Sequence, residues 1–77
     1  MNKRSISIKG HRTSIGLEPA FWAALDAAAV TRQMSLPSLV EEIDRARMKE
    51  APPPGLASAL RVFALEVVAS AVGDKPC

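Results

Sequence analysis

Apolar and polar residues alternate from Ser5 to Leu17, and this alternation is the clearest pattern in the first part of the chain. A period of two places successive side chains on opposite faces of an extended strand. Hydroxyl-bearing and basic residues occupy the intervening positions, so the region is predicted to have one apolar face and one polar, basic face. The positions expected on the apolar face are Ile6, Ile8, Thr13, Ile15 and Leu17.

A turn is predicted in the middle of this region, at Gly10-His11. Glycine at the first central position suits a two-residue type II′ hairpin turn. Such a hairpin places Lys9 opposite Arg12, and two like charges at opposed positions favour a bound anion. In the alternative arrangement, residues 1–10 are a flexible arm and only residues 11–17 form a strand, because isolated hairpins are marginal and chain ends commonly fray.

Helical spacing of apolar residues begins after the strand region. Glu18-Pro19 suits a helix start, because proline in the first turn lacks only an amide that the helix does not use. The spacing predicts a first helix from about Pro19 to Arg32 and, with Ser35 as its N-cap, a second from about Leu36 to Met48. The apolar residues at helical spacing are Phe21, Trp22, Leu25, Ala28 and Ala29 in the first helix and Leu36, Leu39, Val40 and Ile43 in the second. Five of them are expected in the core or the dimer interface: Trp22, Leu25, Leu39, Val40 and Ile43.

The proline-rich segment 50–55 cannot continue a helix and is predicted to be a stiff connection. A third helix is predicted over residues 56–72. Its inward stripe contains Leu60, Phe63 and Val67, whereas Val62, Leu65 and Val68 widen its apolar surface well beyond one face. A helix that is apolar on more than one side must be covered on more than one side. We therefore expect it to contact both its own subunit and a partner subunit.

A chain of 77 residues buries little apolar surface and needs additional stabilisation. Disulfides and a zinc site do not supply it, since Cys77 is the only cysteine and His11 the only histidine. A homodimer is the simplest closed assembly that would supply this additional stabilisation. Neither a metal nor another cofactor is expected.

The net charge of +2 is unevenly distributed. Residues 1–17 contain four basic residues and no acid, whereas residues 18–77 carry a net charge of −2. This uneven distribution of charge indicates that the N-terminal region binds a polyanion. No paired carboxylates, nucleophile and base, or glycine-rich phosphate loop indicates an enzyme. The sequence has no recognisable signal peptide or membrane-spanning stretch, so a cytoplasmic protein with no membrane partner is expected.

The order strand, helix, short serine-containing turn and helix resembles the ribbon-helix-helix superfamily of bacterial and phage DNA-binding proteins. The segment 13–19 carries this resemblance, together with the inward residues of the two helices. Further motifs are similar to a small bacterial ribbon-helix-helix family with an added C-terminal helix. These motifs are Lys3-Arg4-Ser5, Gly10-His11-Arg12-Thr13-Ser14, Phe21-Trp22 and Ala59-Leu60-Arg61-Val62-Phe63.

The resemblance implies double-stranded DNA as a partner. It also implies that a pair of antiparallel strands, one from each subunit, enters the major groove and reads it with residues that face away from the helices. It implies base contacts by Arg12, Ser14 and Gly16, and phosphate contacts at the start of the second helix by Ser35, Leu36 and Ser38. The basic region adds Lys3, Arg4, Lys9 and His11 as candidate DNA contacts. A dimeric transcriptional repressor is the function expected.

The alternative is a dimeric protein-interaction module, antitoxin-like or adaptor-like, that uses the basic face or the third helix. A second strand formed by residues 3–9 would count against groove insertion, because two hairpins at a dimer axis make four strands and the major groove admits two. The basic face would then suit a flatter anionic partner, such as an acidic protein surface or a phosphate backbone.

The expected fold is α+β and mostly helical, with an N-terminal β-ribbon followed by three helices in an intertwined homodimer. Residues 1–10 are an arm or first strand, 11–49 the ribbon-helix-helix core, and 50–55 the connection. Residues 56–72 belong to the same domain, and 73–77 are a tail. The residues expected in the core or the dimer interface are Ile15, Leu17, Trp22, Leu25, Leu39, Val40, Ile43, Leu60, Phe63 and Val67.

Overall fold

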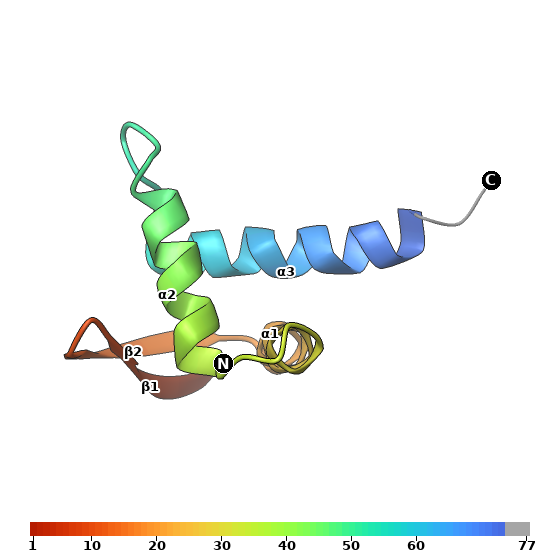
Figure 1. The fold of residues 1–77 in the computed structure, drawn as a ribbon, viewed down its shortest axis with the longest axis horizontal. Coiled ribbons are helices and arrows are strands. Elements are labelled where there is room, and N and C mark those ends of the chain that lie inside the picture. Colours follow the sequence, from red (N-terminus) through yellow and green to blue (C-terminus); the bar gives the residue numbers. More distant parts are fainter. Residues whose placement is uncertain (74–77) are drawn as a thin grey trace.

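The computed structural model describes residues 1–73, and residues 74–77, which hold Cys77 and most of the expected tail, lie outside the described part. Two strands are followed by three helices, as the alternation and the helical spacing predicted. Their bounds are β1 Asn2–Ile8, β2 His11–Leu17, α1 Pro19–Thr31, α2 Leu36–Arg47 and α3 Leu56–Gly73. The strands form one layer, and the helices lie on one side of it (Figure 1).

β1 and β2 form an antiparallel hairpin within one chain, so the N-terminal residues are a strand and not an arm. Both strands of the ribbon thus come from one chain, and not one from each subunit as the resemblance implied. The predicted turn position was wrong by one residue. Lys9 and Gly10 are the central turn residues, with φ angles of 52° and 82°. Positive φ at both positions defines a type I′ turn, whose twist matches that of the flanking strands. As a result Arg12 pairs with Ser7, not with Lys9, and the expected opposition of two like charges does not occur.

The shifted turn leaves the two faces of the hairpin as expected. Each β1 residue pairs with a β2 residue two positions earlier than the predicted partner, and a shift of two preserves the alternation. The isoleucines at positions 6, 8 and 15 and Leu17 are buried against the helices. The apolar face of the hairpin is therefore one wall of the core.

Local signals in the sequence account for where α1 and α2 begin. Pro19 occupies the first turn of α1, and the carbonyl of Glu18 accepts hydrogen bonds from the amides of Phe21 and Trp22. Ser35 caps α2, because its hydroxyl accepts a hydrogen bond from the amide of Ser38 at 3.2 Å. Seven of the nine apolar positions that the spacing predicted in these helices are buried, among them Trp22, Leu25 and Leu39. Phe21 and Leu36 are only partly buried.

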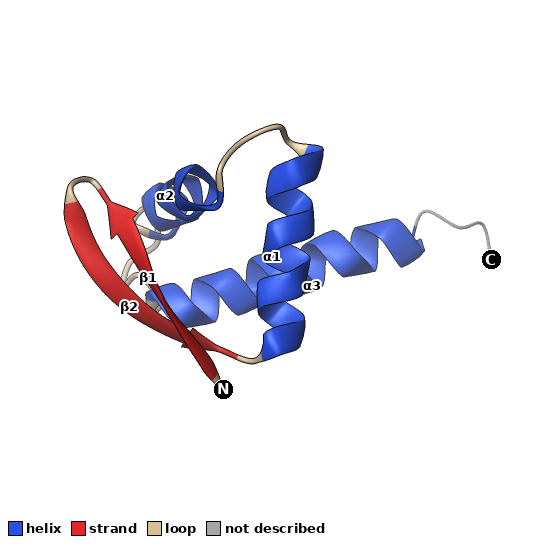
Figure 2. Cartoon of the chain, turned by 90° about the horizontal axis from the view of Figure 1, so that it is seen from below, coloured by secondary structure: helices blue, strands red, loops and turns tan. Residues whose placement is uncertain are grey.

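α3 packs across both α1 and α2, and its C-terminal half extends beyond α1 (Figure 2). Leu60 and Ala64 are buried on the side that faces the core, while Phe63 and Val67 are partly buried. The opposite side of α3 is exposed, with Val62 and Leu65 more than half accessible. One chain thus covers only one of the two apolar sides of this helix.

The connection from α2 to α3 is held by Arg47. Its Nε donates to Oδ1 of Asp44 at 2.7 Å, and its Nη1 donates to the carbonyl of Pro54 at 2.9 Å. Asp44 is almost fully buried, and this ion pair compensates the buried charge. The pair and the Pro54 contact fix the direction in which the chain enters α3.

Candidate nucleic-acid interface

The side of the hairpin that faces away from the helices is polar and basic. We call it the outer face of the hairpin. The pairing places Lys3 opposite Gly16, Ser5 opposite Ser14, and Ser7 opposite Arg12. All of these residues are exposed except Gly16, which is partly buried, and none is acidic. The outer face consists of Lys3, Ser5, Ser7, Arg12, Ser14 and Gly16. Five of its six residues carry a hydroxyl or a positive charge.

Ser5 and Ser7 were not among the expected site residues, although a signal for them was present. They have the same position in the alternation as Lys3, and their exposure follows from that position. The hydroxyl of Ser7 lies beside the Arg12 position in the pairing. The outer face therefore has more hydrogen-bonding groups on β1 than was expected from β2 alone.

Lys9 and His11 lie at the tip of the hairpin. Lys9 is in the turn, and its side chain is exposed. His11 pairs with Ile8 on the helix-facing side, but His11 is exposed as well. The backbone amide of Lys9 donates to Oε2 of Glu41 in α2 at 3.3 Å. This contact anchors the turn to α2 and leaves the Lys9 side chain at the surface.

Gly16 is on the outer face, but it is crossed by neighbouring side chains. A Cβ atom at this position would meet Sδ of Met1 at 3.0 Å and Cγ of Lys3 at 3.6 Å. The small size of Gly16 therefore lets Met1 and Lys3 cross the strand closely. Any base contact here would use the backbone, since glycine has no side chain.

Arg4 lies on the opposite side of the hairpin from Lys3 and Arg12. Its guanidinium is 4.7 Å from the centroid of the Trp22 ring, and its Nη1 donates to Oδ1 of Asp26 at 3.1 Å. Both charged side chains are a little under half exposed. The structure thus places Arg4 at the junction of hairpin and α1, where it stacks on an aromatic ring.

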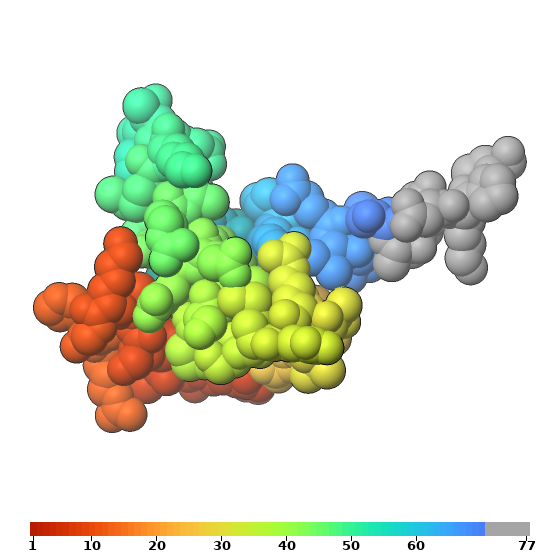
Figure 3. Space-filling view, in the orientation of Figure 1, coloured from red at the N-terminus to blue at the C-terminus, as the bar shows by residue number. Residues whose placement is uncertain are grey.

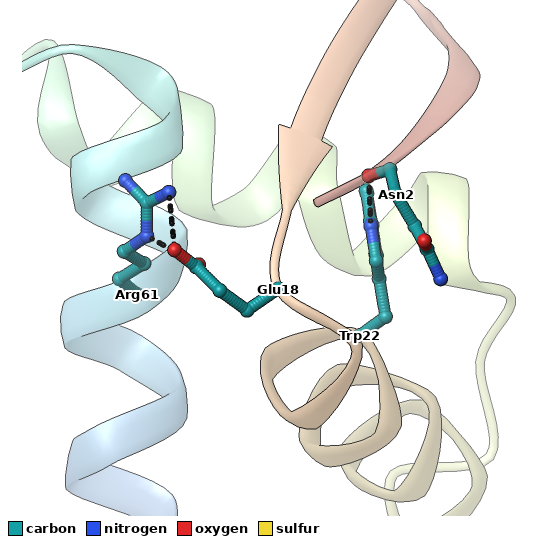
Figure 4. A network of polar contacts seen from close by, with 4 residues as sticks. All are labelled: Asn2, Glu18, Trp22 and Arg61. Atoms are coloured by element: carbon teal, nitrogen blue, oxygen red, sulfur yellow. Dashed lines mark hydrogen bonds and ion pairs between the residues drawn. The ribbon is translucent and has the colours of Figure 1, made fainter.

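Trp22 fixes the start of β1 on the helices. Its ring is buried, and its indole Nε1 donates to the carbonyl of Asn2 at 2.8 Å (Figure 4). A buried indole N–H needs such a partner, because leaving it unpaired is costly. Together with Arg4 above the ring, this bond determines the position of β1 relative to α1.

A second polar contact joins α3 to the junction between β2 and α1. Nε of Arg61 donates to Oε1 of Glu18 at 3.0 Å, and Nη2 donates to Oε2 at 3.4 Å (Figure 4). A hydrogen bond from its own backbone amide, together with these contacts from Arg61, lowers the pKa of the Glu18 carboxyl. These contacts therefore favour the ionised form of Glu18 over the protonated form.

The start of α2 offers fewer backbone donors than the resemblance implied. The Ser38 amide is used by the Ser35 hydroxyl, and Pro37 has no amide hydrogen. The Ser35 hydroxyl in turn donates to Oγ of Ser38 at 3.0 Å. In the first turn of α2, the backbone amide of Leu36 is therefore the one that is used neither by the Ser35 cap nor by a hydrogen bond within the helix. Ser35 and Ser38 are exposed, and Figure 1 shows this end of α2 at the level of the hairpin.

Within the described residues 1–73, no three residues of the types His, Cys, Asp and Glu are grouped so as to hold a metal ion. None of the helices in this part of the chain has the length and apolar character needed to cross a membrane.

The chain matches the family described as "Ribbon-helix-helix domain" over residues 1–68, which is most of its length. It therefore belongs to the ribbon-helix-helix domain family. Members of this family generally bind DNA as dimers and act as transcription regulators or antitoxins. Comparison with curated proteins and with solved structures gave no match.

Proposed function

We propose that the chain binds double-stranded DNA sequence-specifically through the outer face of the hairpin, in the major groove, and that it acts as a transcriptional repressor. The observation that carries this proposal is the exposure of Lys3 and Arg12 among serine hydroxyls on a face without acidic residues. Such a face attracts phosphate and offers donors to base edges. Family membership supports the same class of function.

The dimensions of the hairpin suit this partner. The major groove is about 12 Å wide and admits a two-stranded β-ribbon. A single chain already supplies both strands of such a ribbon, since β1 and β2 pair with each other. Groove entry thus needs only one hairpin at each DNA site.

The proposed contacts divide into two kinds. Arg12 and Ser14 are the base-reading side chains, because arginine can donate two hydrogen bonds to guanine and a serine hydroxyl can pair with donors or acceptors. Lys3 and Lys9 are proposed phosphate contacts at the margins of the hairpin, with His11 beside Lys9 at its tip. Ser35, Leu36 and Ser38 remain candidates for a phosphate at the start of α2. Arg4 is committed to Trp22 and Asp26 and would act mainly by positioning β1.

A binding experiment tests the base-reading role of Arg12. Preferred duplexes are selected from a randomised pool with the unaltered chain, and affinities are then measured by fluorescence anisotropy over a range of salt concentrations. Arg12→Ala should lose about 1 to 3 kcal/mol for each base contact and show flattened sequence preference. Lys3→Ala should weaken binding to all sequences alike and reduce the salt dependence.

Arg45→Ala is the matched control, because it removes the same charge from an exposed site in the last turn of α2. It should change affinity far less than Arg12→Ala. Unchanged affinity and selectivity in Arg12→Ala would exclude reading by the ribbon.

The second candidate is a dimeric protein-interaction module, antitoxin-like or adaptor-like. The exposed apolar side of α3, with Val62, Leu65 and Val68, favours it. Salt separates the two candidates, since DNA binding through several basic contacts weakens steeply as salt rises, whereas an apolar contact does not. Under either candidate we propose a cytoplasmic bacterial protein without enzymatic activity.

A further inference from the structure

We propose that Met1 contacts the C5 methyl group of thymine from the Gly16 end of the outer face of the hairpin. Met1 directly precedes β1, and the alternation of side chains along a strand places it on the same face as Lys3. Its side chain is 76% exposed. This role rests on the proposed function and adds a specificity-determining residue to the same face.

The side chain of Met1 lies over Gly16 of the opposite strand. Gly16 pairs with Lys3 and occupies an outer-face position. A Cβ atom on Gly16 would lie 3.0 Å from Sδ and 3.5 Å from Cγ of Met1. Because Gly16 lacks this atom, the thioether occupies its place. Met1 therefore supplies a side chain at the outward position where Gly16 has none.

The chemistry of the outer face changes at this end. Cγ of Lys3 would lie 3.6 Å from the same Cβ atom, so the aliphatic part of Lys3 flanks the thioether. Toward the turn, the outer face continues with the paired hydroxyls of Ser5 and Ser14 and then with Arg12. The outer face thus offers hydrogen-bonding groups along most of its length and an apolar surface at the Gly16 end.

An apolar surface in the major groove fits one base in particular. Thymine presents its C5 methyl group there, whereas the other bases are distinguished by hydrogen-bond donors and acceptors. Methionine suits such a contact because its side chain is unbranched, flexible and polarisable. A contact with this methyl group separates thymine from cytosine, which has a hydrogen at the same carbon.

The length of β2 separates this thymine from the guanine proposed for Arg12. Arg12 and Gly16 are four residues apart on one strand, which is about 13 Å of extended chain. Base pairs follow one another by about 3.4 Å along the DNA axis, and the groove winds around that axis. A ribbon that lies along the groove therefore places the two contacts roughly two to four base pairs apart.

The backbone that carries Met1 is already held in place. The carbonyl of Asn2, the next residue, accepts the hydrogen bond from the Trp22 indole at 2.8 Å. In the space-filling view, the red and orange hairpin forms one end of the molecule (Figure 3). Only the side chain of Met1 then has to become ordered when DNA binds, which limits the entropic cost of the contact.

Replacing thymine by deoxyuridine tests the contact, because it removes the C5 methyl group alone. Each thymine of a selected duplex is replaced in turn, and affinities are measured by fluorescence anisotropy. The unaltered chain should lose about fourfold in affinity at the thymine that faces Met1, which is the effect of one buried methyl group. Met1→Ala should bind the thymine and deoxyuridine duplexes equally, with unchanged circular dichroism. This variant is released from a cleavable fusion that leaves position 1 as its first residue.

Met48→Ala is the matched control, since Met48 is an exposed methionine at the end of α2 and lies outside the outer face of the hairpin. It should keep the fourfold discrimination. Met1→Leu retains an apolar side chain and should keep most of it. A merely structural role of Met1 would change stability but not the response to deoxyuridine.

Three results would overturn the proposal: a preferred site without thymine, a parent chain indifferent to deoxyuridine at every position, or full discrimination in Met1→Ala. Each of them is separate from the test of the proposed function. If Arg12→Ala still flattens sequence preference, the ribbon reads DNA without help from Met1. If Arg12→Ala changes nothing, reading by the ribbon itself is excluded.

Discussion

The guanidinium of Arg4 lies 4.7 Å from the centroid of the Trp22 ring, and this contact separates it from the other basic residues of the hairpin. Lys3 and Arg12 are on the outer face of the hairpin, whereas Arg4 faces the helices and pairs with Asp26. Lys3 and Arg4 are therefore neighbours on one strand that differ in their contacts. Replacing each of them by alanine separates an effect on stability from an effect on DNA affinity.

Arg4→Ala should lower the free energy of unfolding by about 1 kcal/mol, since a partly exposed cation–π contact contributes about that much. Lys3→Ala should leave stability almost unchanged and reduce DNA affinity more than Arg4→Ala does. Urea denaturation and anisotropy titrations on the same two variants measure both effects. If Arg4→Ala is fully stable yet fails to bind DNA, Arg4 is a DNA contact and not a positioning residue.

Lys9→Asn should stabilise the hairpin and weaken DNA binding at once. A non-glycine residue in the left-handed region costs about 1 to 2 kcal/mol, and asparagine tolerates it better than lysine does. The melting temperature should therefore rise while affinity for every DNA sequence falls modestly, because one phosphate contact is lost. Lys9→Gln keeps the strained φ and also removes the charge, so it should weaken DNA binding without raising the melting temperature.

Acid should remove the stabilisation that Glu18 provides. The pKa of Glu18 is lowered by its backbone amide and by Arg61, so the folded state favours the carboxylate. Such a group contributes its full stabilisation above its ordinary pKa and loses it as the pH falls through the lowered value. Glu18→Gln should flatten the pH dependence of stability in that acidic window. The effect should be small, because the side chain is 46% exposed and well solvated.

The sequence predicted the elements well because their signals are local. A period of two predicted β2 and indicated β1, although a flexible arm stayed an alternative for residues 1–10, and Pro19 and Ser35 placed the starts of α1 and α2. The turn was misplaced because Gly10 fits either of two adjacent turns. Both turns leave Ile6 and Ile15 on the same face, so the hydrophobic pattern could not choose between them.

The role of Arg4 could be inferred only in part from the sequence. The sequence analysis named Arg4 as a candidate DNA contact, although its position in the alternation is the same as that of Ile6, on the helix-facing side. Its partner Asp26 is 22 residues away in the chain and belongs to a different element, so no local pattern connects the two. The pairing of Glu18 with Arg61 spans 43 residues and was hidden for the same reason. Long-range polar contacts of this kind depend on how the elements pack.

The hairpin also determines the order of events when the protein folds. Its strands are joined by only the turn at Lys9 and Gly10, so their hydrogen bonds close short loops within one chain. Closing a short loop is fast, and its rate does not depend on the protein concentration. Formation of the ribbon is therefore a first-order process, separate from the second-order encounter of two copies. A single chain can therefore form the outer face of the hairpin without meeting another copy.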